Sequence, residues 1–374
     1  MRQVSRRSAL RIGVGGALAA AGAVALPGTA GASGVAPVPG TDEVTPPDAP
    51  AAVGGRKVRD LTGPEETGAF AAPWTDLGIP VRCPDGSVLL VCGDSFTGSG
   101  VGAADWRAPI ALRCPDGAPD ALLVTGSVGG AHAEQLVPED HLPLPGGNST
   151  AIPSDAFTIG DTMYLHLMRG VIHQTEHSDL WRSRDNGNTW EYLCKWPGNQ
   201  HAGQFQQKTY AVAQDGYCYV LSTAFNRDTS SGLLLHRVPH ARVGEPAAYE
   251  PWGFADGAWR WGNPPTTVAR QREWGEICFR AMGGKYALTW LNLDPVSIRA
   301  QVFALPTSNL HTTPEQTMIT ATAPGKETGT AVAHPYGGFI VPGSTFADFH
   351  ITVSQWYDAQ NYRVMQYRIT GLTS

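Results

Sequence analysis

Short apolar runs recur along the chain, and turn residues separate them. Many of the runs are rich in β-branched and aromatic residues, and Pro-Asp-Gly, Asp-Gly or Gly-Gly often stands between them, which predicts antiparallel strands joined by hairpins. A helix is expected only as a single turn within residues 245–250. The pattern predicts an all-β chain with strands at 87–92, 110–114, 162–168, 217–223, 233–238, 286–291, 298–304, 350–355 and 362–369.

One hairpin carries a recognisable turn pattern, because residues 183–190 read Ser-x-Asp-x-Gly-x-Thr-Trp, the sequence of an Asp-box. In such a turn Ser183 and Asp185 close the loop through side-chain to backbone hydrogen bonds, Gly187 takes a positive φ, and Trp190 packs beneath. Asp-boxes occur mainly on the outer hairpins of β-propeller blades, so this pattern indicates fold rather than chemistry. At about 45 to 60 residues per blade, the folded part would form five to seven blades.

The N-terminus predicts export. Residues 5–11 contain the pair Arg6-Arg7, and an Ala/Gly/Val/Leu stretch follows, ending in Ala30-Gly31-Ala32. This is the form of a twin-arginine signal peptide with an A-x-A cleavage site, so we expect residues 1–32 to be removed and the protein to be secreted without membrane insertion. Residues 33–57 are rich in Pro, Ala and Gly, as in a flexible linker. A single domain is expected over residues 58–374.

Charge and cysteine content exclude several classes of protein. The net charge of −6 becomes about −10 once the four arginines of the signal are removed, which makes nucleic acid and anionic lipid poor partners. The six cysteines, Cys83, Cys92, Cys114, Cys194, Cys218 and Cys278, form no C-x-x-C pair, so a zinc ribbon or redox site is not expected. Disulfides such as 83–114 or 194–218 and six buried thiols are both compatible with the sequence.

Two aspartates stand out at the ends of expected strands. Asp94 ends the apolar run 89–93, and Asp76 holds a similar position one hairpin earlier, within Thr75-Asp76-Leu77-Gly78. An acid next to a buried strand needs a partner or a chemical role. A pair of carboxyl groups is what hydrolysis of a glycosidic bond requires, one to protonate the leaving oxygen and one to assist water or to attack. Each aspartate could instead cap a turn.

Segments spread over nearly the whole chain resemble one family of secreted actinobacterial proteins, the endo-D-arabinanases of glycoside hydrolase family 183, formerly a domain of unknown function. The segments are 75–78, 93–96, 106–109, 152–155, 180–190, 205–207, 217–223, 236–239, 249–253, 274–276 and 353–356. The resemblance implies a five-bladed β-propeller that cleaves α-D-arabinofuranosyl linkages in the D-arabinan of mycobacterial arabinogalactan and lipoarabinomannan. It also implies catalytic roles for the positions of Asp76 and Asp94, with no cofactor.

Further site residues follow from analogy and neighbourhood. Glu276 is a third catalytic candidate, by analogy with other five-bladed arabinanases that use three acids, although a salt-bridged structural role is equally open. The expected substrate-binding residues are Asp155, Arg107, Trp106, Gln206, Gln207 and Tyr210, and packing or turn formation is the alternative for each. His166, His173 and His177 match no zinc spacing, and no metal site is expected.

Two other functions remain as alternatives to a hydrolase of D-arabinan polysaccharide or oligosaccharide. A β-propeller can bind a cell-wall glycan without cleaving it. A sialidase would also carry Asp-boxes, but its chemistry needs three arginines around a carboxylate, and Arg82 within Ile79-Pro80-Val81-Arg82 is the only trace of its opening motif. Inversion of the anomeric configuration is favoured by analogy with related five-bladed enzymes.

Overall fold

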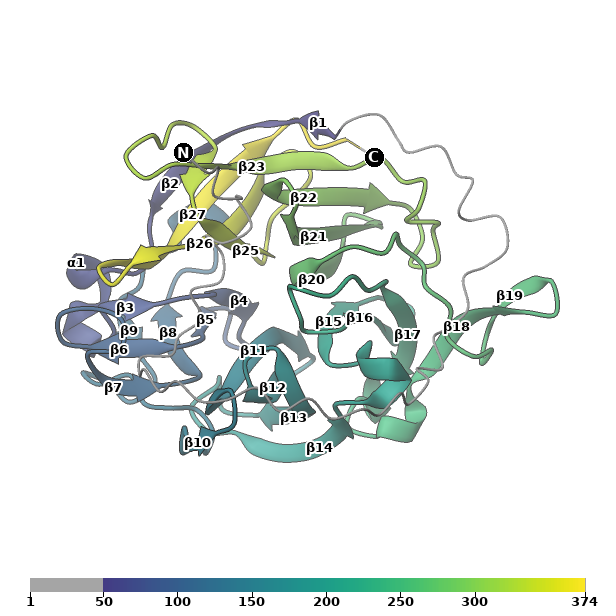
Figure 1. Ribbon diagram of the computed structural model, residues 1–374, viewed down its shortest axis with the longest axis horizontal. Coiled ribbons are helices and arrows are strands. Elements are labelled where there is room, and N and C mark those ends of the chain that lie inside the picture. The colour runs from purple at the N-terminus through teal and green to yellow at the C-terminus, as the bar shows by residue number, and fades with distance from the viewer. Residues whose placement is uncertain (1–49, 374) are drawn as a thin grey trace, which may run out of the picture.

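The computed structural model describes residues 50–373. The regular secondary structure of this part of the chain is almost entirely β-strand (Figure 1). Among these residues the one α-helix is the short α1 (Pro64–Thr67), and residues 245–250 contain a 3-10 turn at Pro246–Ala248. None of the described helices is long and apolar enough to cross a membrane. The signal peptide and most of the linker predicted from the sequence lie outside the described residues.

Most strands fall into five larger sheets that follow one another along the chain. The first sheet contains β4 (Ile79–Arg82), β5 (Val88–Cys92), β8 (Ile110–Cys114) and β9 (Gly126–Ser127). The second contains β10 (Pro143–Leu144), β11 (Gly147–Ile159), β12 (Thr162–Val171), β13 (Gln174–Ser183) and β14 (Glu191–Pro197). The third contains β15 (Gln207–Val212), β16 (Tyr217–Thr223), β17 (Leu234–Pro239), β18 (Glu250–Ala255) and β19 (Ala258–Trp261).

The last two sheets contain both ends of the described chain. The fourth is built from β20 (Trp274–Met282), β21 (Lys285–Leu293), β22 (Val296–Phe303) and β23 (Gln316–Thr322), with β1 (Ala51–Ala52) and β24 (Ala331–Ala333) paired to β23. The fifth is built from β25 (Pro335–Ile340), β26 (Phe349–Asp358), β27 (Asn361–Thr370) and β2 (Gly54–Asp60). A small sheet of β3 (Trp74–Thr75), β6 (Ser95–Thr97) and β7 (Ala104–Arg107) precedes and interrupts the first.

The larger sheets are arranged around a central axis (Figure 1). The inner strands β4, β11, β15, β20 and β25 contact one another in that order, and β25 contacts β4, which closes a ring. The N-terminal β2 pairs antiparallel with the C-terminal β27, so one sheet joins the two ends of the chain. Strand structure is therefore present before Val58, in β1 and β2, because backbone pairing outweighs the Ala/Gly-rich composition of residues 51–55.

Apolar packing explains why these segments are strands. All five residues of β5 are buried, which is typical of a strand covered on both faces. All six cysteines are free thiols and buried among the apolar side chains, so the disulfide alternative is not realised. Burial raises the pKa of the Cys114 and Cys218 thiols to about 12, which leaves them protonated and unreactive.

The turn between β13 and β14 has the local contacts that its sequence calls for. The Asp185 carboxylate accepts hydrogen bonds from the Ser183 hydroxyl at 2.7 Å and from the Thr189 amide at 3.0 Å. Gly187 has a φ of 78°, and the Trp190 indole donates to its carbonyl at 3.1 Å. The turn lies against the first sheet, since Arg113 donates to the Asn186 carbonyl. It links neighbouring sheets and carries no free carboxylate.

Candidate active site

Asp76 lies in a strained connection between β3 and β4. The two residues after it, Leu77 and Gly78, both have left-handed backbones, with φ of 59° and 62°. A bulky residue such as leucine adopts this conformation only at a cost in free energy, and such strain is frequent at functional sites. The backbone carbonyl of Asp76 accepts a hydrogen bond from Gly93 at 3.1 Å, which ties it to the segment that carries Asp94.

Gly93 is needed for this approach. A Cβ atom on Gly93 would lie 2.5 Å from Oδ1 of Asp76, which is closer than real Cβ contacts allow. The small residue between β5 and β6 therefore lets the two acidic segments meet. Asp76 and Asp94 lie close enough for the charge of Asp94 to raise the pKa of Asp76.

Asp94 is held by groups from the small sheet and the second sheet. The Trp106 indole donates to Oδ1 at 2.8 Å, and the Thr150 hydroxyl donates to the same oxygen at 3.3 Å. Trp106 stacks on the His141 ring with a centroid distance of 3.9 Å. Of the residues expected to bind substrate, Trp106 is the one that the structure places beside a catalytic candidate.

Glu276 approaches the same space from β20 in the fourth sheet. One of its oxygens accepts a hydrogen bond from the Gly337 amide at 3.2 Å, and the other forms an ion pair with Arg227. The Arg227 guanidinium lies 5.8 Å from the centroid of the Tyr336 ring. Glu276 is thus salt-bridged, as the structural alternative proposed, and it also faces Asp76, because its charge contributes to raising the pKa of that residue.

The environments of the two aspartates differ. Burial, the charge of Asp94 and the charge of Glu276 hold the pKa of Asp76 well above its ordinary value, against hydrogen bonds from Tyr362 and Tyr336. The Tyr336 hydroxyl donates to Oδ2 of Asp76 at 3.1 Å. Burial also raises the pKa of Asp94, but the Trp106 indole, His141 and Thr150 oppose this increase. The raised pKa therefore favours the protonated form more strongly at Asp76 than at Asp94, whose carboxylate accepts hydrogen bonds from Trp106 and Thr150.

Asp155 is placed differently from the expectation for a substrate-binding residue. Its side chain is fully buried and forms a two-point ion pair with Arg280, at 2.6 and 2.9 Å. The Thr209 hydroxyl and the Tyr210 amide also donate to it, at 2.9 and 2.7 Å. With these partners the carboxylate joins β11, β15 and β20 inside the ring and has no face open to a sugar.

The other expected contact residues also bond or pack within the protein, although Oε1 of Gln207 and the hydroxyl of Tyr210 are buried without a hydrogen-bond partner in the described part of the chain. Arg107 is buried and donates to the backbone carbonyls of Ala133 and Ala71. Gln207 donates to the Gly275 carbonyl, and Gln206 bonds to residues 198 and 225. Tyr210 is fully buried and stacks on Phe157 at 4.2 Å. These placements show packing and turn formation, the alternatives to substrate contact.

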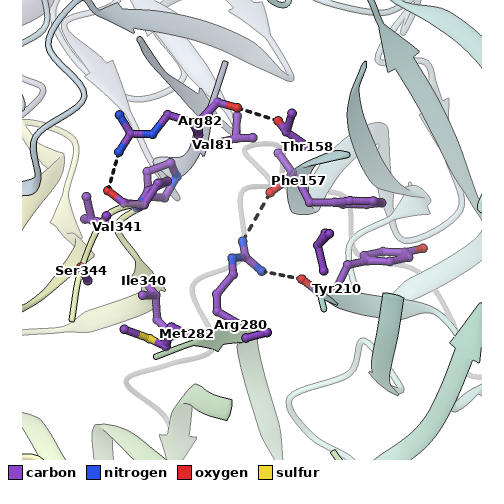
Figure 2. Close-up of a pocket in the computed structure, with 16 residues that line it drawn as sticks. Val81, Arg82, Phe157, Thr158, Tyr210, Arg280, Met282, Ile340, Val341 and Ser344 are labelled. Atoms are coloured by element: carbon purple, nitrogen blue, oxygen red, sulfur yellow. Dashed lines mark hydrogen bonds between the residues drawn. The ribbon is translucent and has the colours of Figure 1, made fainter. Parts of the chain in front are cut away.

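A separate recess lies at the other end of the ring (Figure 2). It is lined by the last residues of the inner strands and by residues 341–344, whereas the acids stand before or near the first residues of β4 and β20. Arg280 lies four positions after Glu276 along β20, which corresponds to roughly 13 Å of strand. Arg280 lines this recess (Figure 2), and its buried partner Asp155 lies behind it.

Several residues of the site could not be found from sequence. Tyr336, Tyr362, Arg227 and Thr150 stand in ordinary strand or loop contexts and meet the acids only through the closure of the ring. Tyr336 is 260 residues from Asp76. Among the described residues, no group of three or more His, Cys, Asp or Glu side chains is arranged to hold a metal ion.

The all-β ring with its acidic site has the fold of β-propeller glycoside hydrolases. The family described as domain of unknown function DUF4185 matches residues 62–368, and the chain belongs to this family. A protein of Mycolicibacterium smegmatis, described as an uncharacterized 35.9 kDa protein in the asd 3′ region, is 29% identical over 332 residues, which cover 82% of this chain and 95% of that protein.

Two solved structures share the fold at low sequence identity. A protein of Bacteroides ovatus ATCC 8483 that is assigned as a hydrolase superposes with a TM-score of 0.60 and 13% identity, over 81% of this chain and 87% of its own. A structure from the GH130 family of mannoside phosphorylases, which contains glycoside hydrolases that target β-1,2 mannosidic linkages in Candida mannan, superposes with a TM-score of 0.50 and 13% identity, over 86% of this chain and 95% of its own. These similarities concern the fold.

Proposed function

We propose that this protein is a glycoside hydrolase that cleaves α-D-arabinofuranosyl linkages within the D-arabinan of mycobacterial arabinogalactan and lipoarabinomannan. The resemblance of segments along the chain to endo-D-arabinanases supports the substrate. The closed ring of five inner strands supports a five-bladed propeller, and the fold shared with glycoside hydrolases supports a glycan as the ligand. Residues 1–32 suggest that the enzyme acts outside the cell after twin-arginine export.

The observation that carries the proposal is the convergence of Asp76 and Asp94 in environments that separate their protonation. Asp76 has two negative neighbours and a pKa well above its ordinary value, while Asp94 is stabilised by an indole, a hydroxyl and a nearby imidazole. Pairs of carboxyl groups whose environments push their pKa values apart act as acid and base in glycosidases.

In this assignment the protonated Asp76 donates its proton to the glycosidic oxygen as the bond from that oxygen to the anomeric carbon breaks. Asp94, ionised, removes a proton from water as the water oxygen bonds to the same carbon. The products are a shortened chain with a new reducing end and a free hydroxyl on the leaving chain. Asp76 ends ionised and Asp94 protonated, and exchange with solvent restores both. Attack by water from the opposite face inverts the anomeric configuration.

Glu276 assists as the third acid. Its charge favours the protonated form of Asp76, and its position is fixed by the Gly337 amide and by Arg227. A negative neighbour that is itself paired with an arginine keeps its place while the charge on Asp76 changes. This role requires proximity to Asp76 and does not require that Glu276 exchange a proton with the sugar.

The proposal is tested by incubating the wild type, Asp76→Asn, Asp94→Asn and the exposed control Asp116→Asn with arabinogalactan and measuring oligosaccharide release. We expect products from the wild type and the control and a loss of about 10²- to 10⁴-fold in either site variant. Binding of arabinogalactan by a wild type that releases no oligosaccharide would instead identify a glycan-binding propeller.

The stereochemistry is tested separately by following the anomeric signals of the first products by NMR. Early appearance of the anomer opposite to that of the substrate is expected for the water-attack mechanism. Early appearance of the same anomer would assign Asp94 as a nucleophile in a retaining mechanism, and the hydrolase assignment itself would stand.

A further inference from the structure

A group of polar side chains faces the acids from the second and third sheets. His173 occupies the two-residue turn between β12 and β13, and Arg227 lies in the connection between β16 and β17. The pKa of His173 is lowered by burial and by the charge of Arg227, and the charge of Glu276 acts on it in the opposite direction. These three residues therefore share one neighbourhood.

Two atoms of this group are buried and have no hydrogen-bond partner within the described part of the chain. They are Nε2 of His173 and Nε of Arg227, and Oδ1 of Asp76 is in the same condition. Buried polar atoms in folded proteins nearly always have a hydrogen-bond partner. Buried atoms beside a candidate site that lack a partner are therefore positions where a ligand can supply the missing hydrogen bonds. An imidazole nitrogen, a guanidinium N–H and a carboxyl oxygen together suit vicinal hydroxyl groups.

The group is held in place before any ligand arrives. His173 has a φ of 64°, so its ring is presented by a left-handed turn residue. Phe225 packs edge-on against this ring at 5.4 Å, and the Asn226 amide donates to the His173 carbonyl at 3.5 Å. Arg227 is fixed by Glu276 and by the Tyr336 ring. Because little ordering remains for binding, each hydrogen bond contributes more of its free energy to affinity.

The charges around His173 and Arg227 favour an uncharged ligand. Glu276 already neutralises the Arg227 guanidinium, and burial disfavours the charged form of the His173 imidazole. An acidic sugar would bring a carboxylate into a space that holds Asp76, Asp94 and Glu276 without a free cation to receive it. An uncharged ring with hydroxyl groups meets no such cost.

We propose that His173 and Arg227 form a subsite for the hydroxyl groups of an uncharged furanose ring, beside Glu276 and Asp76. The inference rests on the proposed function and specifies its substrate binding. Trp106 belongs to the small sheet and His141 leads into the second, while Arg227 and Glu276 come from the third and fourth. A glycan chain that contacts both the Trp106–His141 stack and the His173–Arg227 pair would place separate rings at these two groups, next to the acids. This arrangement suits cleavage within a chain.

The test compares His173→Gly and Arg227→Lys with the wild type. Glycine preserves the left-handed turn and removes the imidazole, and lysine preserves the charge opposite Glu276 and removes the unpaired Nε–H. The control is His240→Ala, since His240 also has a buried, unpartnered Nε2 but lies at the outer end of β17. The dissociation constant of a neutral D-arabinan oligosaccharide is measured by calorimetry in the Asp94→Asn background, and KM and kcat are measured without that substitution.

Loss of one hydrogen bond predicts binding about 3- to 10-fold weaker in each variant, with a parallel rise in KM and no change in the control, and for His173→Gly a kcat within about twofold of wild type. Unchanged affinity in both variants would overturn the subsite even if arabinan is hydrolysed. Affinity that depends on His173 in a protein that releases no products would instead overturn the hydrolase and keep the subsite. Binding of a uronic acid oligosaccharide as tight as that of the neutral one would contradict the argument from charge.

Discussion

Asp155 and the acidic site around Asp76 lie at different levels along the axis of the ring. They differ in the groups that compensate their negative charge. In the middle, the Asp155 carboxylate receives two bonds from Arg280, one from a hydroxyl and two from backbone amides. At the end near the starts of the inner strands, Asp76 faces two other acids and receives hydrogen bonds from tyrosines. One acid is fully paired inside the fold, and the other is surrounded by like charge.

This difference distinguishes a structural role for Asp155 from the catalytic role that we propose for Asp76. Asp155 connects three inner strands, and its ionised form is the one that the fold stabilises. The site raises the pKa of Asp76 and so favours its protonated form, which is unfavourable for stability and suits the proton donation that we propose. The following substitutions exploit the contrast.

The largest effect is expected on activity from Asp76→Asn. Asparagine keeps the shape of the side chain and cannot donate the catalytic proton, so arabinan hydrolysis should fall about 10²- to 10⁴-fold. The free energy of unfolding, measured by urea denaturation, should stay equal to that of wild type or rise. A variant that loses activity together with stability would show that Asp76 is a structural residue like Asp155.

Asp155→Ala should have the opposite profile. It leaves Arg280 buried without its partner, and breaking such a pair costs about 3–5 kcal/mol of unfolding free energy. The folded fraction should hydrolyse arabinan with a kcat near that of wild type. In the double variant Asp155→Leu/Arg280→Met, most of the lost stability should return, because apolar replacement removes both charges. A loss below about 1 kcal/mol in the single variant would contradict a structural role for the pair.

A smaller effect is expected on the pH profile from Trp106→Phe. The activity of the wild type should be bell-shaped in pH, with the acidic limb set by protonation of Asp94 and the alkaline limb by deprotonation of Asp76. The Trp106 indole lowers the pKa of Asp94 through its hydrogen bond, so its removal should move the acidic limb to higher pH and leave the alkaline limb in place. A shift of the alkaline limb alone would reverse the two roles.

The smallest effect is on the pH dependence of stability. Because the pKa of Asp76 is raised in the folded chain, there is a pH range above its ordinary value in which the folded chain keeps a proton that the unfolded chain has released. Stability therefore falls as pH rises through this range and is not lost further above the raised pKa. When the free energy of unfolding is measured by urea denaturation from pH 4 upward, the stability of Asp76→Asn relative to that of the wild type should increase with pH. A constant difference would contradict the raised pKa.

The sequence predicted the strands well, because their apolar runs and turns are local signals. The expected segments 110–114 and 217–223 coincide with β8 and β16, and the single turn near residue 246 is also present. The first two strands of the described residues, Ala51–Ala52 and Gly54–Asp60, were not predicted from the sequence. These segments are strands only because they pair with β23 and β27.

The site was predicted only in part for the same physical reason. Asp76 and Asp94 are neighbours across one hairpin, and their sequence context is local. The roles of Asp155 and Asp76 depend on distant partners, since Arg280 is 125 residues from Asp155 and Tyr336 is 260 residues from Asp76. No spacing rule in the sequence distinguishes the acid that finds an arginine from the acid that finds two other acids.

The division of roles between Asp76 and Asp94 is tested most directly by changing the leaving group. A dinitrophenyl glycoside of a D-arabinan oligosaccharide departs without protonation, so it needs the base but not the acid. The account predicts that Asp76→Asn hydrolyses this substrate within about tenfold of the wild-type rate while failing on arabinan, and that Asp94→Asn fails on both. Equal loss in the two variants on the activated substrate, or recovery in Asp94→Asn alone, would contradict it.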